Sequence, residues 1–402
     1  MIPVTIELIQ AARARIRDAI YHSPCPYSLS LSRLCNARIY CKLDHLQMTG
    51  SFKERGARNK LLTMTPEARA AGVIACSAGN HALGLSYHGQ LLGVPVTVVM
   101  PTFAPLVKVT NCRAFGATVV LHGDSLDAAR QLALSIAAER GLTFIGPFED
   151  PQVIAGQGTM GLEILEDVPD VDAVIVPVGG GGLIAGVATA IKALRPATRI
   201  IGVESASAPT LRASLDAGKP TRVIPKPTLA DGLAVAQIGD INFEIARRLV
   251  DDLAVVNEEE TALAILRLLE LEKMVLEGAG AVPLAAAMRG GLGLEGKKVV
   301  LVLCGGNIDL TMVSRIIERG LAADGRLVRI GVAISDRPGS LARVLAIIGD
   351  TGASVKEVEH DRHFGPRDVA LTRVNLTLET RDFGHIARIR EAIQSAGIVC
   401  TE

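Results

Sequence analysis

The chain has 402 residues, of which 49% are hydrophobic and 21% are charged. At roughly 100–200 residues per domain this length predicts two or three domains, and the hydrophobic content excludes a long disordered protein. Lys and Arg together number 42, as do Asp and Glu, so no basic surplus favours binding to nucleic acid or to an anionic membrane surface.

The sequence carries no pattern typical of membrane insertion or secretion. No uninterrupted apolar run approaches the ~18–20 residues of a membrane-spanning helix. The first twenty residues mix apolar and charged groups at helical spacing, unlike a signal peptide. The seven cysteines form neither a C-x-x-C pair nor a zinc-like spacing. We therefore expect reduced thiols in a cytoplasmic protein.

Residues 37 to about 320 repeat one pattern, in which a short apolar strand is followed by a small-residue loop and then by a helix. Examples begin at Val73, Val174 and Val299, and PVTVVM, ATVVLH and RIIGVE are further short strands. Continuous apolar strands that alternate with helices predict parallel sheets covered on both faces. Ligands of such folds bind at the carboxyl ends of the strands, which is where the small-residue loops lie.

The first candidate functional residue is a lysine in the segment QMTGSFKERGA, which begins at Gln47. Lys53 follows Phe52 in a hydroxyl-rich turn that opens a predicted helix. Most lysines are solvated surface residues, but this turn suits a lysine that faces an anion. A lysine held in such a site can lose its proton and form a Schiff base. Taken alone, the segment indicates this chemistry only weakly.

The strand that begins at Val73 ends in the loop CSAGNH, just before the next predicted helix. Ser77, Asn80 and free backbone N–H groups at a helix N-terminus suit a carboxylate or a phenolate oxygen. The alternative is an ordinary helix-capping turn. His81 by itself is more often a packed or surface residue than a catalytic one.

Four consecutive glycines, Gly179–Gly182, separate another strand from its helix. They allow several backbone N–H groups to point at one phosphate, and the helix N-terminus adds positive potential. The same segment fits the dinucleotide fingerprint G-x-G-x-x-A from Gly180, with Glu204 near the position of a ribose-binding acid. A NAD-dependent oxidoreductase therefore stays open here, although it offers no role for Lys53.

A third glycine-rich loop, CGGN, follows the strand VVLVL and begins at Cys304. A cysteine at the end of a strand is usually a small buried apolar residue. Because this loop parallels the other two, we treat Cys304 as a candidate site residue.

The pattern changes after Gly320. Residues 321–326, LAADGR, predict a short linker. The remaining stretch predicts the order strand, helix, strand, strand, helix, strand, with bounds at 327–335, 340–349, 354–361, 368–379, 383–395 and 398–401. This βαββαβ order is the ferredoxin-like plan.

Together these loops resemble the β-family (fold type II) of pyridoxal-phosphate enzymes, and within it the serine/threonine dehydratases, or threonine ammonia-lyases. The segments TGSFKERGA, SAGNHALG, VMPTFAPLVKV, VIAGQGTMGLEI, VPVGGGGLIAG and CGGNIDL follow in the family's order. The resemblance implies an α/β, two-part, tryptophan-synthase-β-like fold with parallel sheets over residues 1–320, with a smaller subdomain inserted at about 45–150. Residues 327–402 resemble an ACT regulatory domain, which opens with ISDRPGSLARVL.

The resemblance implies a role for each candidate residue. Lys53 corresponds to the Schiff-base lysine, and Phe52 is expected beside pyridoxal 5'-phosphate. Asn80 corresponds to the residue that hydrogen-bonds the phenolic oxygen of the cofactor, and Cys304 to the one that faces its pyridine nitrogen. The residues expected to hold the phosphate are Gly179, Gly180, Gly181 and Gly182. The residues expected to hold the substrate carboxylate are Ser77, Gly79, Asn80 and His81.

Two positions depart from patterns found in relatives. Glu204 and Ala208 match two cation-binding positions, but Thr210 replaces the acidic third one. The resemblance therefore leaves a metal site undecided. Ala78 stands where related serine racemases carry a serine, which implies poor racemisation.

The implied reaction is the α,β-elimination of L-threonine to 2-oxobutanoate and ammonia, with L-serine as a lesser substrate. Other β-hydroxy amino acids, such as serine or 3-hydroxyaspartate, are alternatives, and a non-catalytic amino-acid sensor is a third one that an intact Lys53 argues against. The ACT-like domain implies an amino-acid effector, with isoleucine as the first candidate in a route to isoleucine. It would bind at the turn that contains Asp336 and Gly339. Relatives also imply a homo-oligomer, either a dimer or a tetramer.

Overall fold

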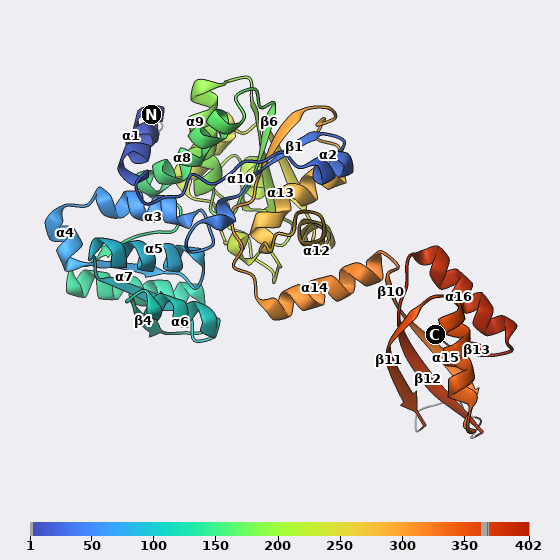
Figure 1. Ribbon diagram of the computed structural model, residues 1–402. Coiled ribbons are helices and arrows are strands. Elements are labelled where there is room, and N and C mark those ends of the chain that lie inside the picture. Colours follow the sequence, from blue (N-terminus) through green and yellow to red (C-terminus); the bar gives the residue numbers. More distant parts are fainter. Residues whose placement is uncertain (1–2, 363–367, 369, 402) are drawn as a thin grey trace. The chain divides into compact units, whose positions relative to one another are not determined.

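A computed structural model describes residues 3–362, 368 and 370–401. The chain divides into two compact units, Met1–Ile308 and Asp309–Glu402 (Figure 1). This division lies before the expected boundary at Gly320, because helix α14 (Leu310–Ala323) packs against strand β10 (Leu327–Ser335) of the second unit. Helix α14 also includes the first three residues of the expected linker. Among the described residues, no helix is both long and apolar enough to cross a membrane.

The first unit contains two parallel sheets, as the sequence pattern predicts. The larger sheet has the strand order β1-β9-β6-β7-β8, and the smaller one has the order β4-β3-β2-β5. The strands are β1 (Arg38–Lys42), β2 (Val73–Cys76), β3 (Val96–Met100), β4 (Thr118–Leu121), β5 (Thr143–Phe144), β6 (Ala173–Pro177), β7 (Arg199–Ser205), β8 (Asp252–Val256) and β9 (Lys298–Val302).

Helices alternate with these strands along the chain. The α-helices of the first unit are α1 (Ile6–Ile16), α2 (Leu29–Cys35), α3 (Lys53–Leu62), α4 (Pro66–Ala71), α5 (Asn80–Leu92), α6 (Leu106–Ala114), α7 (Leu126–Arg140), α8 (Pro151–Asp167), α9 (Gly182–Leu194), α10 (Thr210–Ala217), α11 (Asp240–Leu249), α12 (Glu258–Arg267) and α13 (Gly278–Arg289). Three short helical segments are η1 (Asp44–Leu46), η2 (Asp231–Leu233) and η3 (Leu268–Glu272).

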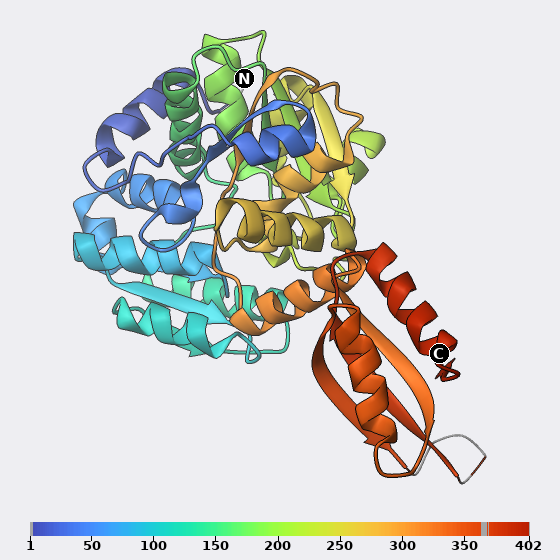
Figure 2. The same cartoon turned by 45° about the vertical axis from the view of Figure 1, so that its right-hand side comes forward.

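The larger sheet is buried between helices. All five residues of β6 are buried, which explains its continuous apolar sequence. Helix α13 packs against β6, β7, β8 and β9, whereas α9 packs against β6 together with α8 and α11 (Figure 1 and Figure 2). Helices α8 and α9 approach each other closely at Gly186. A Cβ at this position would lie only 2.4 Å from the carbonyl oxygen of Ile154.

The smaller sheet has its own apolar core on each face. On one face, α3, α5 and α6 cover a cluster that includes Leu61, Val98 and Cys112. On the other face, α7 contributes Ala129 and Ala133, which pack on Ile74 and Val99. This sheet therefore carries the Lys53 helix and the Asn80 helix on the same face, which places two candidate residues on neighbouring elements.

The second unit has the predicted βαββαβ order and an antiparallel sheet with the strand order β11-β12-β10-β13. After β10, its elements are α15 (Ser340–Asp350), β11 (Ser354–Asp361), β12 (Leu371–Glu379), α16 (Phe383–Ser395) and β13 (Val399–Thr401). Strand β12 begins three residues after the expected Asp368, and residue 369 lies outside the described residues. Buried residues such as Val332, Val374, Ile348 and Ile389 form its core.

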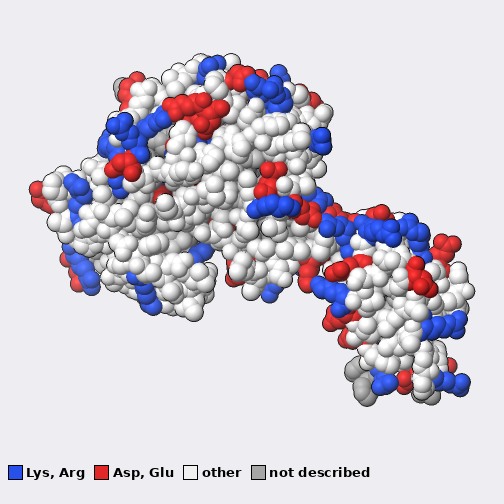
Figure 3. All heavy atoms as spheres, in the orientation of Figure 1, with Lys and Arg blue, Asp and Glu red and all other residues white. Residues whose placement is uncertain are grey.

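The balanced composition is visible on the surface. On the face of the first unit drawn in Figure 3, Lys and Arg side chains are interspersed with Asp and Glu side chains. This distribution agrees with the equal numbers of basic and acidic residues in the chain.

Candidate active site

The turn that carries Lys53 is joined to the loop that follows β9. Ser51 forms an isolated antiparallel bridge with Gly305. The backbone N–H of Phe52 donates to the carbonyl oxygen of Cys304 at 3.0 Å. Two of the predicted loops, about 250 residues apart in the sequence, therefore lie side by side.

Lys53 is the first residue of α3, and its side chain is partly buried. Its Nζ donates a hydrogen bond to the carbonyl oxygen of Pro147 at 2.9 Å and lies 5.1 Å from the ring centroid of Phe52. Burial lowers the pKa of Lys53 to about 8, against the opposing influence of Cys304 and Glu277. With this pKa roughly a tenth of the lysine is a neutral amine at pH 7, far more than for an ordinary lysine, and the neutral amine is the form that a nucleophile or base requires.

Asn80 is the first residue of α5 and connects three loops. Its Nδ2 donates to Oε1 of Glu277 at 2.7 Å, and its Oδ1 accepts from Nδ2 of Asn307 at 2.9 Å. Nδ2 of Asn307 also donates to the carbonyl oxygen of Thr49 at 2.7 Å. These bonds bring the SAGN and CGGN loops to the turn that precedes Lys53.

The other residues of the SAGN loop differ in their exposure. Oγ of Ser77 accepts from the backbone N–H of Gly79 at 3.2 Å, and both residues are partly exposed. His81 is instead buried, with Nε2 at 3.1 Å from the carbonyl oxygen of Ile145. Burial, and secondarily the charge of Lys53, lowers the pKa of His81 to about 4. A neutral His81 can still offer its backbone N–H at the start of α5 to an anion.

The glycine loop lies between β6 and α9 and has the properties of an anion site. Within the described residues, no hydrogen-bond acceptor engages the backbone N–H groups of Gly179–Gly182. Gly181 has a φ of 86°, which favours glycine. A Cβ at Gly180 would lie 2.2 Å from the ring of Phe148. The loop therefore presents free donors at a helix N-terminus, in a space that side chains would fill.

Cys304 is buried at the end of β9, where its Sγ lies 3.5 Å from the carbonyl oxygen of Ala279. Burial, together with the nearby carboxyl group of Glu277, raises the pKa of this thiol well above its ordinary value. The thiol therefore stays protonated and neutral.

Glu277, which precedes α13, belongs to the same cluster but was not among the residues selected from the sequence. It is buried, its backbone N–H donates to the carbonyl oxygen of Gly305 at 3.2 Å, and its carboxyl group accepts from Asn80. Burial, with the charge of Asp231, raises the pKa of Glu277 to about 7, against Lys108 and Asn80. A glutamate directly before the small-residue run GAGA was the signal available in the sequence.

Glu204 serves the backbone of α10. Its carboxylate accepts from the backbone N–H groups of Leu211 at 2.6 Å and Arg212 at 2.9 Å, and from Oγ1 of Thr210 at 3.3 Å. Burial raises its pKa to about 7. Ala208 is buried and offers no side-chain ligand. In the described part of the chain, no three His, Cys, Asp or Glu side chains are grouped as metal ligands.

Comparison with known proteins identifies the family. Residues 16–305 match the model of the family described as "Pyridoxal-phosphate dependent enzyme". An L-threonine ammonia-lyase of Thermotoga maritima is 47% identical over 98% of this chain and 98% of its own. A catabolic L-threonine dehydratase of Escherichia coli (strain K12) is 46% identical over 78% of this chain and 96% of its own.

A solved structure agrees with these sequence relatives. The processed form of threonine deaminase isoform 2 from Solanum lycopersicum is 37% identical, with a TM-score of 0.75, and the match covers 78% of this chain and 92% of that one. The family match also decides against the NAD-dependent alternative that the glycine loop left open. The chain therefore belongs to the family of pyridoxal-phosphate dependent enzymes.

Proposed function

We propose that this chain converts L-threonine to 2-oxobutanoate and ammonia, with L-serine as a lesser substrate. The observation that carries the proposal is the partly buried amine of Lys53. Hydrogen bonds of Cys304 and Asn307 join the turn of Lys53 to the CGGN and SAGN loops. The relative from Thermotoga maritima, matched over nearly its whole length, bears the same activity in its name. The products balance the substrate, because water leaves in the elimination and one water is taken up in the release of ammonia.

The residues present fit pyridoxal 5'-phosphate. Lys53 supplies the amine for its aldehyde, and the free N–H groups of Gly179–Gly182 suit its phosphate. Asn80 offers an amide at the position expected for the phenolic oxygen, and Cys304 offers a neutral thiol for the ring nitrogen. Phe52 contributes an apolar ring beside Lys53. When bound, this cofactor supplies the electron sink for negative charge at the substrate Cα.

The chain's own groups then divide the work. Lys53, with a pKa of about 8, removes the proton from Cα as a neutral amine. The backbone N–H groups at the start of α5, with Ser77 and Gly79, bind the substrate carboxylate. Because the thiol of Cys304 is neutral and far less acidic than a carboxyl group, it favours an unprotonated ring nitrogen. An unprotonated ring nitrogen favours elimination over transamination.

The decisive experiment is a steady-state screen of the purified holoenzyme for release of 2-oxo acid. Threonine, serine and 3-hydroxyaspartate are compared at equal concentrations, with Lys53→Ala as the control. The proposal requires threonine to have the highest kcat/KM. A higher value for serine or 3-hydroxyaspartate would assign the enzyme to that substrate instead.

For the second unit we propose the regulation of catalysis by an amino acid, with isoleucine as the first candidate and a role in isoleucine biosynthesis. Gly339, with a φ of 90°, precedes α15, so the turn brings the helix N-terminus next to Asp336. Asp336 forms an ion pair with Arg362, at 3.1 Å from Nε. A carboxylate at the helix N-terminus and an amine at Asp336 would complete an amino-acid site. The Escherichia coli relative matches only 78% of this chain. A variant of this chain that lacks the second unit is therefore a useful comparison.

The expected assembly and location are also proposals. We propose a homo-oligomer, a dimer or a tetramer, which sedimentation of the holoenzyme would measure. We place the enzyme in the cytoplasm, where its seven free cysteines would stay reduced.

A further inference from the structure

Glu54, the residue directly after Lys53, has a completely buried carboxylate. Its Oε1 accepts a hydrogen bond from the backbone N–H of Thr49, and its Oε2 lies 3.2 Å from Nε2 of His88. His88 is also completely buried and lies on α5. Neither side chain contacts the amine of Lys53, so the reaction proposed above leaves this pair without a role.

A buried carboxylate is unfavourable unless hydrogen bonds compensate for its lost hydration. Nδ1 of His88 has no hydrogen-bond partner among the described residues. In the tautomer that carries its proton on Nε2, His88 donates to Glu54 and leaves no buried N–H unpaired. The contact between Glu54 and His88 thus joins α3 to α5, the two helices that carry these side chains.

One face of α5 is applied directly to the turn that carries Lys53. Asn80, Gly84 and His88 are spaced four residues apart and so lie on the same face of this helix. A Cβ at Gly84 would lie 3.2 Å from the backbone nitrogen of Glu54 and 3.3 Å from the carbonyl carbon of Lys53. The same face of α5 thus carries Asn80 of the active site, Gly84 at the close contact with α3, and His88, the partner of Glu54.

The contacts form a closed circuit through the active site. Glu54 holds the backbone of Thr49, and the carbonyl oxygen of Thr49 accepts from Asn307. Asn307 donates in turn to Asn80, which stands at the start of the helix that contains His88. His88 closes the circuit at Glu54.

We propose that Glu54 and His88 are positioning residues that fix the turn of Lys53 against the helix of Asn80. The inference rests on the proposed function only in taking Lys53 as the residue that carries the cofactor. Loss of the pair would let the two elements shift against each other, and a shift of about 1 Å at a reacting centre can cost about 100-fold in rate.

The first test compares Glu54→Leu with Glu54→Gln in the full-length holoenzyme. Glutamine can accept from Thr49 and donate to the other tautomer of His88, whose Nδ1–H is then buried without a partner. This lowers stability but keeps both contacts, so we expect kcat to stay within about threefold of the wild type. Leucine can do neither, and we expect kcat to fall about 10–100-fold with little change in KM. Equal losses in the two variants, or none in Glu54→Leu, would overturn the proposal.

A second measurement needs no substrate. Apoprotein is mixed with pyridoxal 5'-phosphate, and the growth of the visible absorption band of the lysine-bound cofactor gives the rate of capture. We expect about tenfold slower capture in Glu54→Leu and a normal rate in Glu54→Gln. Because this assay involves no amino acid, it still judges the positioning role if the wild type fails to consume threonine.

Two controls separate positioning from loss of stability. His22→Leu disrupts another histidine–carboxylate pair, His22–Asp167 at 3.0 Å, and should change neither rate. Leu61→Ala empties a buried position in the last turn of α3 and should lower the melting temperature without lowering kcat at 25 °C. If Leu61→Ala reduces both rates as Glu54→Leu does, the effect is general destabilisation and the proposal is wrong.

The double variant Glu54→Leu/His88→Leu removes both members of the pair and tests it where His88→Leu alone does not fold. We expect its kcat to equal that of Glu54→Leu, because the second substitution removes a partner that is already lost. A further loss of tenfold or more would show that the two residues act independently.

Discussion

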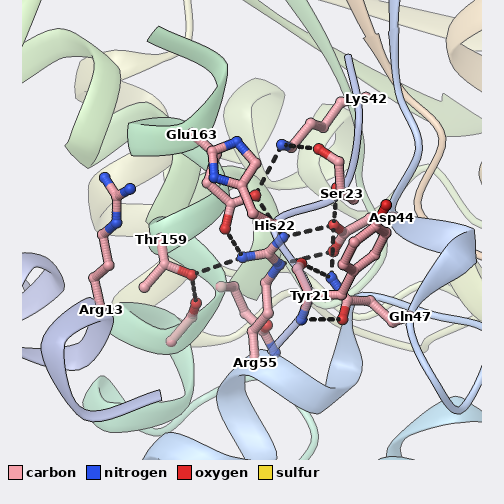
Figure 4. A network of polar contacts seen from close by, with 12 residues as sticks. Arg13, Tyr21, His22, Ser23, Lys42, Asp44, Gln47, Arg55, Thr159 and Glu163 are labelled. Atoms are coloured by element: carbon pink, nitrogen blue, oxygen red, sulfur yellow. Dashed lines mark hydrogen bonds and ion pairs between the residues drawn. The ribbon is translucent and has the colours of Figure 1, made fainter. Parts of the chain in front are cut away.

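A buried ionic network offers the sharpest test of how the Lys53 helix is anchored. Figure 4 shows Arg55 of α3 between two carboxylates. Its guanidinium donates to Asp44 at 2.7 and 2.8 Å and to Glu163 at 2.6 and 2.8 Å, with a fifth bond to Thr159 at 3.1 Å. Lys42, also completely buried, lies 2.8 Å from Glu163. All these N–H groups of Arg55 therefore donate hydrogen bonds to acceptors inside the protein.

Arg55→Met removes the cation and leaves its partners in place. Glu163 keeps Lys42, but Asp44 keeps only the neutral donors Ser23 at 2.7 Å and Gln47 at 3.2 Å. Breaking a buried ion pair on one side typically costs about 3–5 kcal/mol, because a charge is left without compensation. We expect a loss of this size in the free energy of unfolding.

The matched control is Arg13→Met, which breaks the ion pair between Arg13 and Glu166. Both side chains are partly exposed, at 33% and 50%. Water compensates for exposed charges, so this substitution should cost no more than about 1 kcal/mol. The difference between the two losses in the free energy of unfolding measures how much burial increases the cost of breaking an ion pair.

The difference should also depend on pH. In the wild type, burial raises the pKa of Asp44, but the charge and hydrogen bonds of Arg55 outweigh burial and the pKa is lowered. Ionised Asp44 therefore stabilises the fold above its ordinary pKa, and this contribution disappears as the pH falls through the lowered value. In Arg55→Met, only the hydrogen bond of Ser23 and the charge of Lys42 still oppose burial, so the pKa of Asp44 is higher than in the wild type. Protonation of Asp44 then removes its uncompensated charge. The loss in the free energy of unfolding of Arg55→Met should therefore be smaller at about pH 5 than at about pH 7.

Urea unfolding of the apoproteins at both pH values, followed by circular dichroism, measures these differences. The midpoints are compared for the wild type, Arg55→Met and Arg13→Met. Equal, small losses in the two variants would refute the reasoning, as would a deficit of Arg55→Met that grows as the pH falls.

Four further outcomes concern the site and its regulation. Lys53→Ala removes both the covalent anchor and the base, so 2-oxo acid release from threonine should fall by several orders of magnitude. Gly180→Ala places a Cβ 2.2 Å from the ring of Phe148, and spectroscopic titration should show a cofactor Kd raised at least about tenfold, or 1.4 kcal/mol. Cys304→Ser should keep dehydratase activity, whereas Cys304→Asp should raise the ratio of pyridoxamine-phosphate formation to 2-oxo acid release; an unchanged ratio contradicts the electronic role of Cys304. Asp336→Ala should weaken inhibition by isoleucine with basal turnover unchanged, and an identical inhibition curve would remove Asp336 from the effector site.

Much of the architecture follows from local patterns in the sequence. The apolar runs at Val73, Val174 and Val299 predict buried parallel strands, and the small residues after them predict loops at one edge of each sheet. The βαββαβ order of the second unit is predicted for the same reason, since each element has its own periodicity. The sequence does not determine where the first unit ends, because the amphipathic pattern of α14 does not say which unit buries its apolar side.

The contacts that assemble the site depend on the tertiary structure. Glu277 meets Asn80 across 197 residues of sequence, and Pro147 meets the amine of Lys53 across 94. Sequence patterns indicate that a segment is buried, but not which buried polar groups will face each other. Glu54 and Arg55 illustrate this, because in the sequence they read as ordinary charged residues beside Lys53. Their buried partners, His88 on one side and Asp44 with Glu163 on the other, are brought to them only when α3 packs between its neighbouring elements.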